Sequence, residues 1–328
     1  MAAGKTALTY RVYGLSILSE LDIPGAVAVL EAESDPLRVC VCLSSPKPAR
    51  SVEVIFRSPD SGTDGRPAFF QEHCRRTGDI LWTWADGIIF WIESSARTIR
   101  VYWPPGETSQ SAAYYLTGPV LAFLLRRKGK TLLHGSVVTS AQGAVAFLGQ
   151  SGAGKSTTAA AMLQQGFAMV TDDVITLDSA AGGWSVQPGY AGVRLWQDSV
   201  EGLFGSGAVL PRLVDHSDSW PGWDKRFLEV ERHGSVSTEP AMLKAIYALA
   251  PRGAGAPRIE LLGSAEQLIE LDINVFQPIL RQAPQRQADL TLFAAMLRQV
   301  PVKRLHAGDA LARLADVARL VMGDAWAP

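Results

Sequence analysis

The chain has 328 residues, which is longer than one average domain and favours two domains or one enlarged α/β domain. Its 31 Lys and Arg residues almost balance 32 Asp and Glu residues, and a formal net charge of −1 gives no field that would hold a polyanion, so nucleic acid is not an expected partner. The three cysteines are odd in number and lack zinc-site spacing, which is typical of reduced thiols in a cytosolic protein.

The N-terminal part of the sequence consists mainly of predicted strands. These segments are rich in β-branched and aromatic residues, and turn signals such as Asp86-Gly87 separate them. The predicted strands are 10–18, 36–44, 51–58, 67–74, 79–85, 87–94 and 98–104. We expect an antiparallel, β-rich domain over residues 1–108. Alternation places Trp82 and Trp84 on one face of their strand, either to pack a small core or to form a face or edge that receives a peptide.

A helix is expected over 109–127, with a kink near Pro119, as the connection between two domains. Its basic C-terminal end suits the negative end of a helix dipole. The apolar stretch 112–125 within it is too short to span a bilayer, and the N-terminal residues lack the apolar run of a signal peptide. These features predict a soluble cytoplasmic protein without a membrane partner.

After Gly129, strands alternate with helices, which predicts an α/β domain over 131–328 that follows a connecting segment at 109–130. The expected strands are 131–139, 143–148, 167–170, 174–177, 184–187, 244–249, 258–262 and 300–305, and the expected helices are 157–165, 264–274, 287–299 and 309–322. The segment 202–223, which contains His216, is the least regular and suits either a mobile lid or an ordinary surface loop.

The stretch 149–157, Gly-Gln-Ser-Gly-Ala-Gly-Lys-Ser-Thr, satisfies the phosphate-loop pattern in full and lies between a predicted strand and a predicted helix. The first N–H groups of such a helix lack internal partners and can bind phosphate. We expect Lys155 to reach the β- and γ-phosphates of ATP and the Ser156 hydroxyl to bind Mg²⁺. The expected nucleotide-binding residues are Gly149, Ser151, Gly152, Ala153, Gly154, Lys155, Ser156 and Thr157.

Two adjacent acids follow the short apolar strand 167–170. Asp172 and Asp173 lie seventeen and eighteen residues after Lys155, and we expect them at the end of this strand, where an α/β sheet places ligand-binding groups. One acid of such a pair can hold Mg²⁺ while the other accepts a proton from an attacking hydroxyl. His134, on the preceding predicted strand, is either a structural histidine or a contact to nucleotide or substrate.

His134-Gly135, the loop 149–157 and Val170-Thr-Asp-Asp-Val174 together resemble the catalytic domain of the HPr serine kinase/phosphorylase family. That resemblance implies a phosphate-loop fold akin to phosphoenolpyruvate carboxykinase, and ATP- and Mg²⁺-dependent phosphorylation of a serine hydroxyl on a protein or peptide. It also implies that Asp172 is the base, that Asp173 is a metal-side carboxylate and that His134 lies near the transferred phosphoryl group. Because HPr kinases assemble into hexamers, the resemblance leaves a homo-oligomer open.

The segments 10–15, 188–196 and 224–227 are similar to divergent HPr-kinase-like proteins of peptide-modification gene clusters, among them kinases of the C-terminal serine of lasso-peptide precursors. By this resemblance, Arg194, Lys225 and Arg226 are candidates to contact ATP or the charge of the substrate. Two other functions fit the same residues: an ATP-gated peptide-binding module and a small-molecule kinase. A transporter ATPase would need an LSGGQ-type signature, which is absent.

Overall fold

The structure is a computed structural model that describes residues 6–46, 52–61, 65–212, 225–308 and 311–326. The chain divides into two compact units, one formed by residues 1–121 with 212–224, the other by residues 122–211 with 225–328. Residues 213–223 of the predicted lid segment 202–223, with His216, lie outside the described residues. The described half, 202–212, begins with the last turn of a helix that ends at Phe204.

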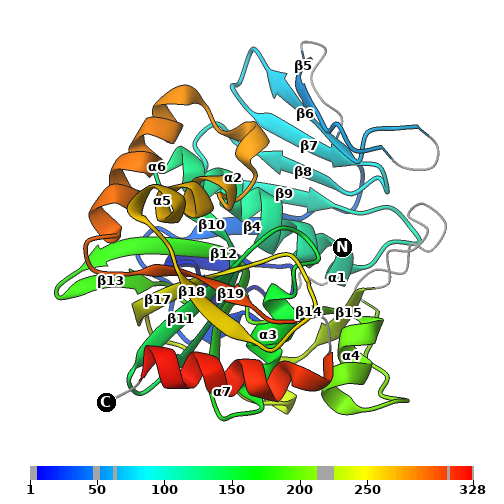
Figure 1. The fold of residues 1–328 in the computed structure, drawn as a ribbon. Coiled ribbons are helices and arrows are strands. Elements are labelled where there is room, and N and C mark those ends of the chain that lie inside the picture. Colours follow the sequence, from blue (N-terminus) through cyan, green and yellow to red (C-terminus); the bar gives the residue numbers. More distant parts are fainter. Residues whose placement is uncertain (1–5, 47–51, 62–64, 213–224, 309–310, 327–328) are drawn as a thin grey trace. The chain divides into compact units, whose positions relative to one another are not determined.

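The first unit is built on one nine-stranded sheet (Figure 1). Its strands are β1 (Leu8–Val12), β2 (Leu15–Ser19), β3 (Val27–Val29), β4 (Leu37–Val41), β5 (Val52–Arg57), β6 (Phe69–Cys74), β7 (Ile80–Trp84), β8 (Ile89–Ile92) and β9 (Thr98–Tyr102), in the spatial order β3-β1-β2-β4-β9-β8-β7-β6-β5. The β-rich prediction is confirmed, but the prediction of an antiparallel sheet is wrong at its centre, because β4 pairs in parallel with both β2 and β9. Parallel neighbours require crossover connections, which strand patterns do not reveal.

The predicted first strand, 10–18, is a hairpin rather than one strand. Val12 pairs with Leu15 across a turn formed by Tyr13 and Gly14, whose φ angles are 56° and 74°. Positive φ at both central residues is the mark of the type I′ turn, which usually contains Asn-Gly or Asp-Gly. The tyrosine at the first position concealed the turn.

The aromatic residues of β6, β7 and β8 form a core. Trp82 is inaccessible to solvent and Trp84 is 6% exposed. The ring of Phe69 stacks on both, at centroid distances of 5.5 Å and 5.7 Å, and Phe90 lies edge-on to Trp84. Of the two roles open for this pair, core packing is therefore confirmed.

The predicted helix 109–127 is present and is interrupted at its proline. It comprises α1 (Ser109–Tyr115), a π-helical turn (Leu116–Val120) that contains Pro119, and α2 (Leu121–Arg127). Proline has no N–H to donate to the preceding turn, so the wider turn accommodates the missing hydrogen bond. No helix in the described part of the chain is long and apolar enough to cross a membrane.

The second unit is a mixed α/β structure around an eight-stranded sheet. Its sheet strands are β10 (Leu132–Ser140), β11 (Gly143–Leu148), β12 (Ala168–Ala180), β13 (Gly183–Val186), β16 (Ser235–Val236), β17 (Ala241–Leu249), β18 (Arg258–Leu261) and β19 (Val302–His306), and β14 (Val193–Trp196) pairs separately with β15 (Lys225–Leu228). Its helices are α3 (Lys155–Leu163), α4 (Gln197–Phe204), α5 (Ser264–Ile273), α6 (Ala283–Met296) and α7 (Leu314–Ala325), with 3₁₀ turns at Val230–Arg232, Pro278–Leu280 and Leu311–Arg313.

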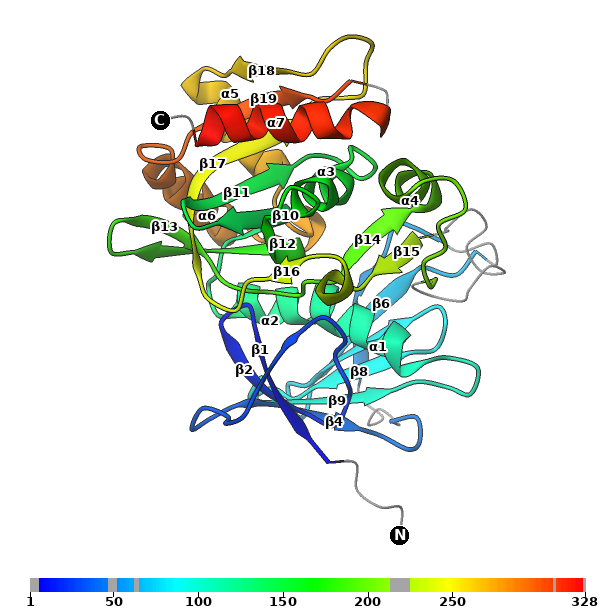
Figure 2. The same ribbon diagram turned by 90° about the horizontal axis from the view of Figure 1, so that it is seen from below.

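Helices cover both faces of this sheet, so the unit has three layers (Figures 1 and 2). Alternation along β11 divides its side chains between two cores. Val145 and Phe147 pack in one core with residues of α3 and α7, whereas Ala144, Ala146 and Leu148 pack in the other with residues of α5 and α6. A strand that is buried on both faces has the continuous apolar sequence that β11 shows.

Candidate active site

The phosphate-loop sequence folds as predicted, between the end of β11 and the first turn of α3. Gly152 and Gly154 have φ angles of 81° and 100°, in the left-handed region that side chains with a Cβ disfavour. Gly154 is the N-cap of α3, and no side chain at this position accepts a hydrogen bond from the first N–H groups of the helix. The first N–H groups of α3 are therefore available to an anion.

The loop borders an open pocket of about 570 Å³, part of which is open solvent. The pocket is lined by His134, Ser151, Gly152, Gly154, Lys155, Ser156, Thr157, Asp172, Asp173, Arg194, Trp196, Lys225 and Arg252. Among the predicted site residues, Gly149, Ala153 and Arg226 do not line it.

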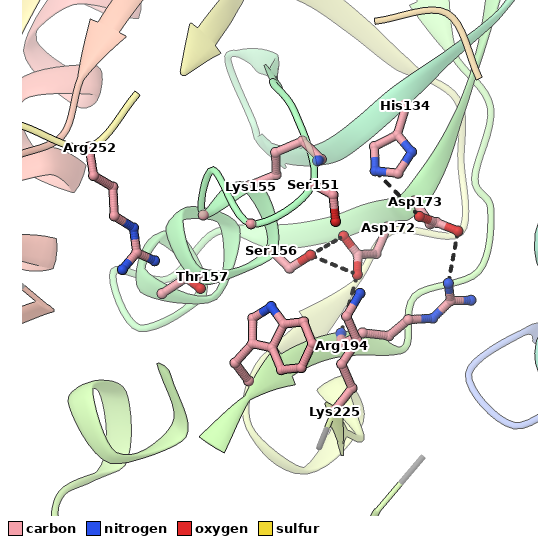
Figure 3. A pocket seen from close by; sticks show the side chains of 13 residues that line it. His134, Ser151, Lys155, Ser156, Thr157, Asp172, Asp173, Arg194, Lys225 and Arg252 are labelled. Atoms are coloured by element: carbon pink, nitrogen blue, oxygen red, sulfur yellow. Dashed lines mark hydrogen bonds and ion pairs between the residues drawn. The ribbon is translucent and has the colours of Figure 1, made fainter. Parts of the chain in front are cut away.

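Asp172 is joined directly to the phosphate loop (Figure 3). The Ser156 hydroxyl lies 3.0 Å and 3.2 Å from the two oxygens of this carboxylate. The buried Ser136 hydroxyl donates to Oδ1 at 2.6 Å, and the backbone N–H of Arg194 donates to Oδ2 at 3.2 Å. Asp172 is 2% exposed, and these donors hold it in one orientation beside Ser156.

Asp172 and Asp173 do not lie at the end of a strand, as the sequence had predicted, because β12 continues through both acids to Ala180. These polar residues belong to the strand because β12 pairs with β10 here. Asp172 lies opposite Ser136, and Asp173 lies opposite Gly135. In a regular strand, consecutive side chains point to opposite faces. Asp173 has a φ of 75°, which breaks that alternation, and both acids line the same pocket.

Asp173 lies between two basic groups. Its Oδ2 accepts a hydrogen bond of 2.8 Å from the buried guanidinium of Arg194, and its Oδ1 lies 3.6 Å from Nε2 of His134. Burial opposes ionisation, but the charge of Arg194 outweighs it, together with that of His134 when its ring is protonated in acid, and the pKa of Asp173 falls to about 2. The carboxylate is therefore ionised at neutral pH.

Burial has the opposite effect on the basic residues of the pocket. It lowers the pKa of His134 from 6.5, against the attraction of Asp173, so the imidazole is neutral at pH 7. Burial also lowers the pKa of the Lys155 ammonium. This ammonium donates to the backbone carbonyls of Gly149 and Gln150, at 2.8 Å and 3.1 Å. These neutral acceptors can be exchanged for phosphate oxygens, which bind an ammonium more strongly.

Lys225 and Arg226, both predicted to contact ATP or the substrate, are neighbours on β15, but only Lys225 lines the pocket. Lys225 lines the pocket, and its ammonium lies 5.4 Å from the ring centre of Trp196, its partner in the β14–β15 pairing. Arg226 is next along the strand, and its guanidinium donates to the carbonyl of Leu210 instead. Because alternate residues of a strand face opposite sides, one of two adjacent residues had to leave the pocket.

Two residues of the pocket were missed by sequence reasoning. Arg252 follows β17, which runs parallel to β11, so the carboxyl ends of both strands lie at the same edge of the sheet. Within the described residues its exposed guanidinium forms no ion pair. Trp196 ends β14 and is 36% exposed. The position after the predicted strand 244–249 was the only available signal for Arg252. Trp196 had only its place in the segment 188–196 that carries the family resemblance.

The oxygen ligands present fit Mg²⁺ rather than a protein-enclosed metal. Among the described residues, no group of three or more His, Cys, Asp and Glu side chains could hold a metal ion. The Ser156 hydroxyl and the Asp172 carboxylate are hard oxygen donors within hydrogen-bond distance of each other. Mg²⁺ is commonly held by one or two such groups together with phosphate oxygens of a nucleotide.

Comparisons with known proteins give a distant likeness among solved structures. No protein-family model matches the chain, and a search of the curated proteins gives no match. Among solved structures, the chain is similar to the HPr(Ser) kinase/phosphatase from Coxiella burnetii, with 13% identity and a TM-score of 0.32 over 59% of this chain and 90% of that chain. The strands and helices of the second unit define it as mixed α/β.

Proposed function

We propose that this protein is an ATP- and Mg²⁺-dependent kinase that transfers the γ-phosphoryl group to a serine hydroxyl of a peptide or protein. The observation that carries the proposal is the hydrogen bond between Ser156 of the phosphate loop and Asp172, with a second carboxylate, Asp173, on the same pocket. A carboxylate beside the loop hydroxyl suits Mg²⁺, and a second carboxylate that lines the same pocket suits the acceptor hydroxyl in phosphoryl transfer.

In this proposal the loop N–H groups and Lys155 bind the phosphates and stabilise the charge that develops on them. Ser156 and Asp172 would hold Mg²⁺, whose charge would neutralise part of the phosphate charge. Asp173 accepts a hydrogen bond from the acceptor hydroxyl and orients its oxygen toward the γ-phosphorus. A bond then forms between that oxygen and phosphorus, the bond to the β-phosphate oxygen breaks, ADP leaves, and the hydroxyl proton passes to Asp173.

This division of roles is the reverse of the one that the family resemblance implies for Asp172 and Asp173. The contact with Ser156 supports Asp172 as the metal-side group. A carboxylate with a pKa of about 2 is a weak base. Phosphoryl transfer through a loose transition state depends mainly on positioning, so Asp173 can act chiefly by orienting the hydroxyl. Arg194 is a positioning residue because its guanidinium fixes Asp173.

The acceptor class rests on the sequence motifs, with one supporting feature of the pocket. The Lys225 ammonium forms no ion pair among the described residues, and its charge acts on Asp173. A cation near the orienting carboxylate suits an acceptor that carries a carboxylate close to its hydroxyl, as a C-terminal serine does. The serine of a lasso-peptide precursor is therefore our proposed substrate.

Mass spectrometry of a serine-ended precursor peptide after incubation with MgATP tests the proposal. Wild-type protein should add a phosphoryl group to the terminal serine, and Lys155→Ala should not. Lys244→Ala, which changes an exposed lysine outside the pocket, should retain the activity. A peptide with a C-terminal amide should be phosphorylated less well if Lys225 reads the carboxylate.

The outcomes separate the proposed kinase from its alternatives. ATP-dependent peptide binding without any phosphopeptide would refute the kinase and favour a gated binding module. Consumption of ATP with an added small alcohol, but with no peptide, would refute the peptide acceptor alone.

A further inference from the structure

Ser136 places a buried hydroxyl inside the sheet of the second unit. It lies on β10, with Phe147 of β11 opposite it on one side and Asp172 of β12 on the other. Its side chain is inaccessible to solvent, as are those of Val137 and Val138, which follow it. Burial of a hydroxyl costs free energy unless the hydroxyl is hydrogen-bonded, so its partner indicates its role.

Within the described residues, the Ser136 hydroxyl forms one hydrogen bond, to Oδ1 of Asp172 at 2.6 Å. The backbone N–H of Arg194, on β14, donates to Oδ2 of the same carboxylate. Because a carboxylate has about four acceptor sites, these two donors leave free capacity on each oxygen. The Ser156 hydroxyl lies 3.0 Å and 3.2 Å from the two oxygens, so this capacity faces the phosphate loop.

We infer that Ser136 is a positioning residue for the Mg²⁺ site, because its hydroxyl fixes the Asp172 carboxylate so that the free oxygen sites face Ser156. The inference rests on the proposed function, which takes Ser156 and Asp172 to hold Mg²⁺. Two donors from two strands prevent rotation of the carboxylate, whereas the longer bond from Arg194 alone, at 3.2 Å, would restrain it less. Removal of such a donor commonly costs about 10–100-fold in metal affinity.

The test compares nucleotide binding with and without the metal. We would measure by calorimetry the affinity of an ATP analogue with a methylene bridge between its β- and γ-phosphates, in saturating Mg²⁺ and in a chelator of divalent metals. Ser136→Ala should lose about tenfold or more in Mg²⁺. Its affinity in the chelator should stay at the wild-type value, because the loop N–H groups and Lys155 are unchanged.

Thr176→Val is the matched control. Thr176 lies on β12 and is 1% exposed, and its hydroxyl has no hydrogen-bond partner within the described residues. Its replacement therefore removes a buried hydroxyl of the same sheet outside the pocket, and it should change neither affinity. A loss in Mg²⁺ equal to that of Ser136→Ala would assign the effect to packing of the sheet and overturn the inference.

Two further variants separate positioning from packing. Ser136→Cys fills the space of the serine with a weak donor, so it should show the same loss in Mg²⁺ as Ser136→Ala. In the Asp172→Asn background, Ser136→Ala should add little further loss, because the carboxylate that it positions is gone. Losses of equal size with and without Mg²⁺, no loss in Mg²⁺, or full additivity with Asp172→Asn would overturn the inference.

The outcome can be distinguished from failure of the kinase itself. Phosphopeptide formation by wild type, with Ser136 variants that bind the analogue normally in Mg²⁺, would leave the kinase standing and overturn the role of Ser136. A loss confined to Mg²⁺ in these variants, without any phosphopeptide in wild type, would do the reverse. Wild-type protein that gains no affinity from Mg²⁺ would overturn both.

Discussion

Replacement of Asp172 by asparagine tests the assignment of the metal-side carboxylate most directly. The change removes one negative charge next to Ser156 and keeps the size of the side chain. It should also preserve the local hydrogen bonds. The amide oxygen can accept from the Arg194 N–H, while the amide NH₂ donates to the hydroxyl oxygens of Ser136 and Ser156.

Because each partner of Asp172 keeps a hydrogen bond, we expect the loss of folding stability to stay within about 1 kcal/mol. The effect on metal binding should be larger, since a carboxylate oxygen is replaced by a neutral amide. Loss of a group that binds or orients a metal ligand commonly costs about 10–100-fold in metal affinity. The Mg²⁺ concentration that gives half-maximal activity should rise by about that factor, and high Mg²⁺ should restore part of the rate.

The assay is initial rate against free Mg²⁺ at saturating ATP, with Asp173→Asn as the matched control. The control should lose rate at every Mg²⁺ concentration, because it removes the group that orients the acceptor hydroxyl, and its half-maximal Mg²⁺ should remain that of wild type. A shifted Mg²⁺ requirement in Asp173→Asn, with none in Asp172→Asn, would refute our assignment and restore the one implied by the family resemblance.

Three further predictions concern pH and stability. Since burial keeps His134 neutral at pH 7, the rate should be level above pH 7. It should fall below pH 6.5, because the protonated ring then forms an ion pair with Asp173. A pH–rate profile of His134→Gln that shows the same fall would contradict this prediction. Asp289→Ala should cost about 3–5 kcal/mol in urea unfolding because it leaves the Arg126 guanidinium buried without its partner, whereas the exposed Asp316→Ala should cost less than about 0.5 kcal/mol. Trp82→Ala should cost about 3–5 kcal/mol through the cavity it leaves, and a calorimetric transition of the first unit close to that of wild type would show that the aromatic core is not essential.

The sequence predicted the elements whose signals are local. The phosphate loop, the hairpin between β12 and β13 and the helix interrupted at Pro119 follow from glycine, proline and apolar periodicity, and all are present. The sequence-based predictions were wrong where pairing with a strand distant in sequence determines the local structure. Thr171 and the two acids after it have turn-forming character, yet they belong to a strand because β10 pairs with them along its length.

The same distinction applies to the site. Lys155, Ser156 and Asp172 could be placed near one another from the motif and the strand order. Trp196 and Arg252 could not, because they reach the pocket through the pairings of β14 with β15 and of β11 with β17. The resemblance implied that Asp173 is the metal-side acid, whereas the acid that contacts Ser156 is Asp172, and this difference depends on the backbone angle of Asp173.

The left-handed backbone of Asp173 implies a conflict between selection for abundance and selection for activity. A non-glycine residue in this region carries a conformational cost of roughly 1–2 kcal/mol, which glycine at the same position would not. In a library of variants sorted by cellular protein level, glycine and asparagine should be enriched at position 173. Sorting the same library by kinase activity should return aspartate alone, and the difference between the two sorted populations would mark this position as functional without any knowledge of the substrate.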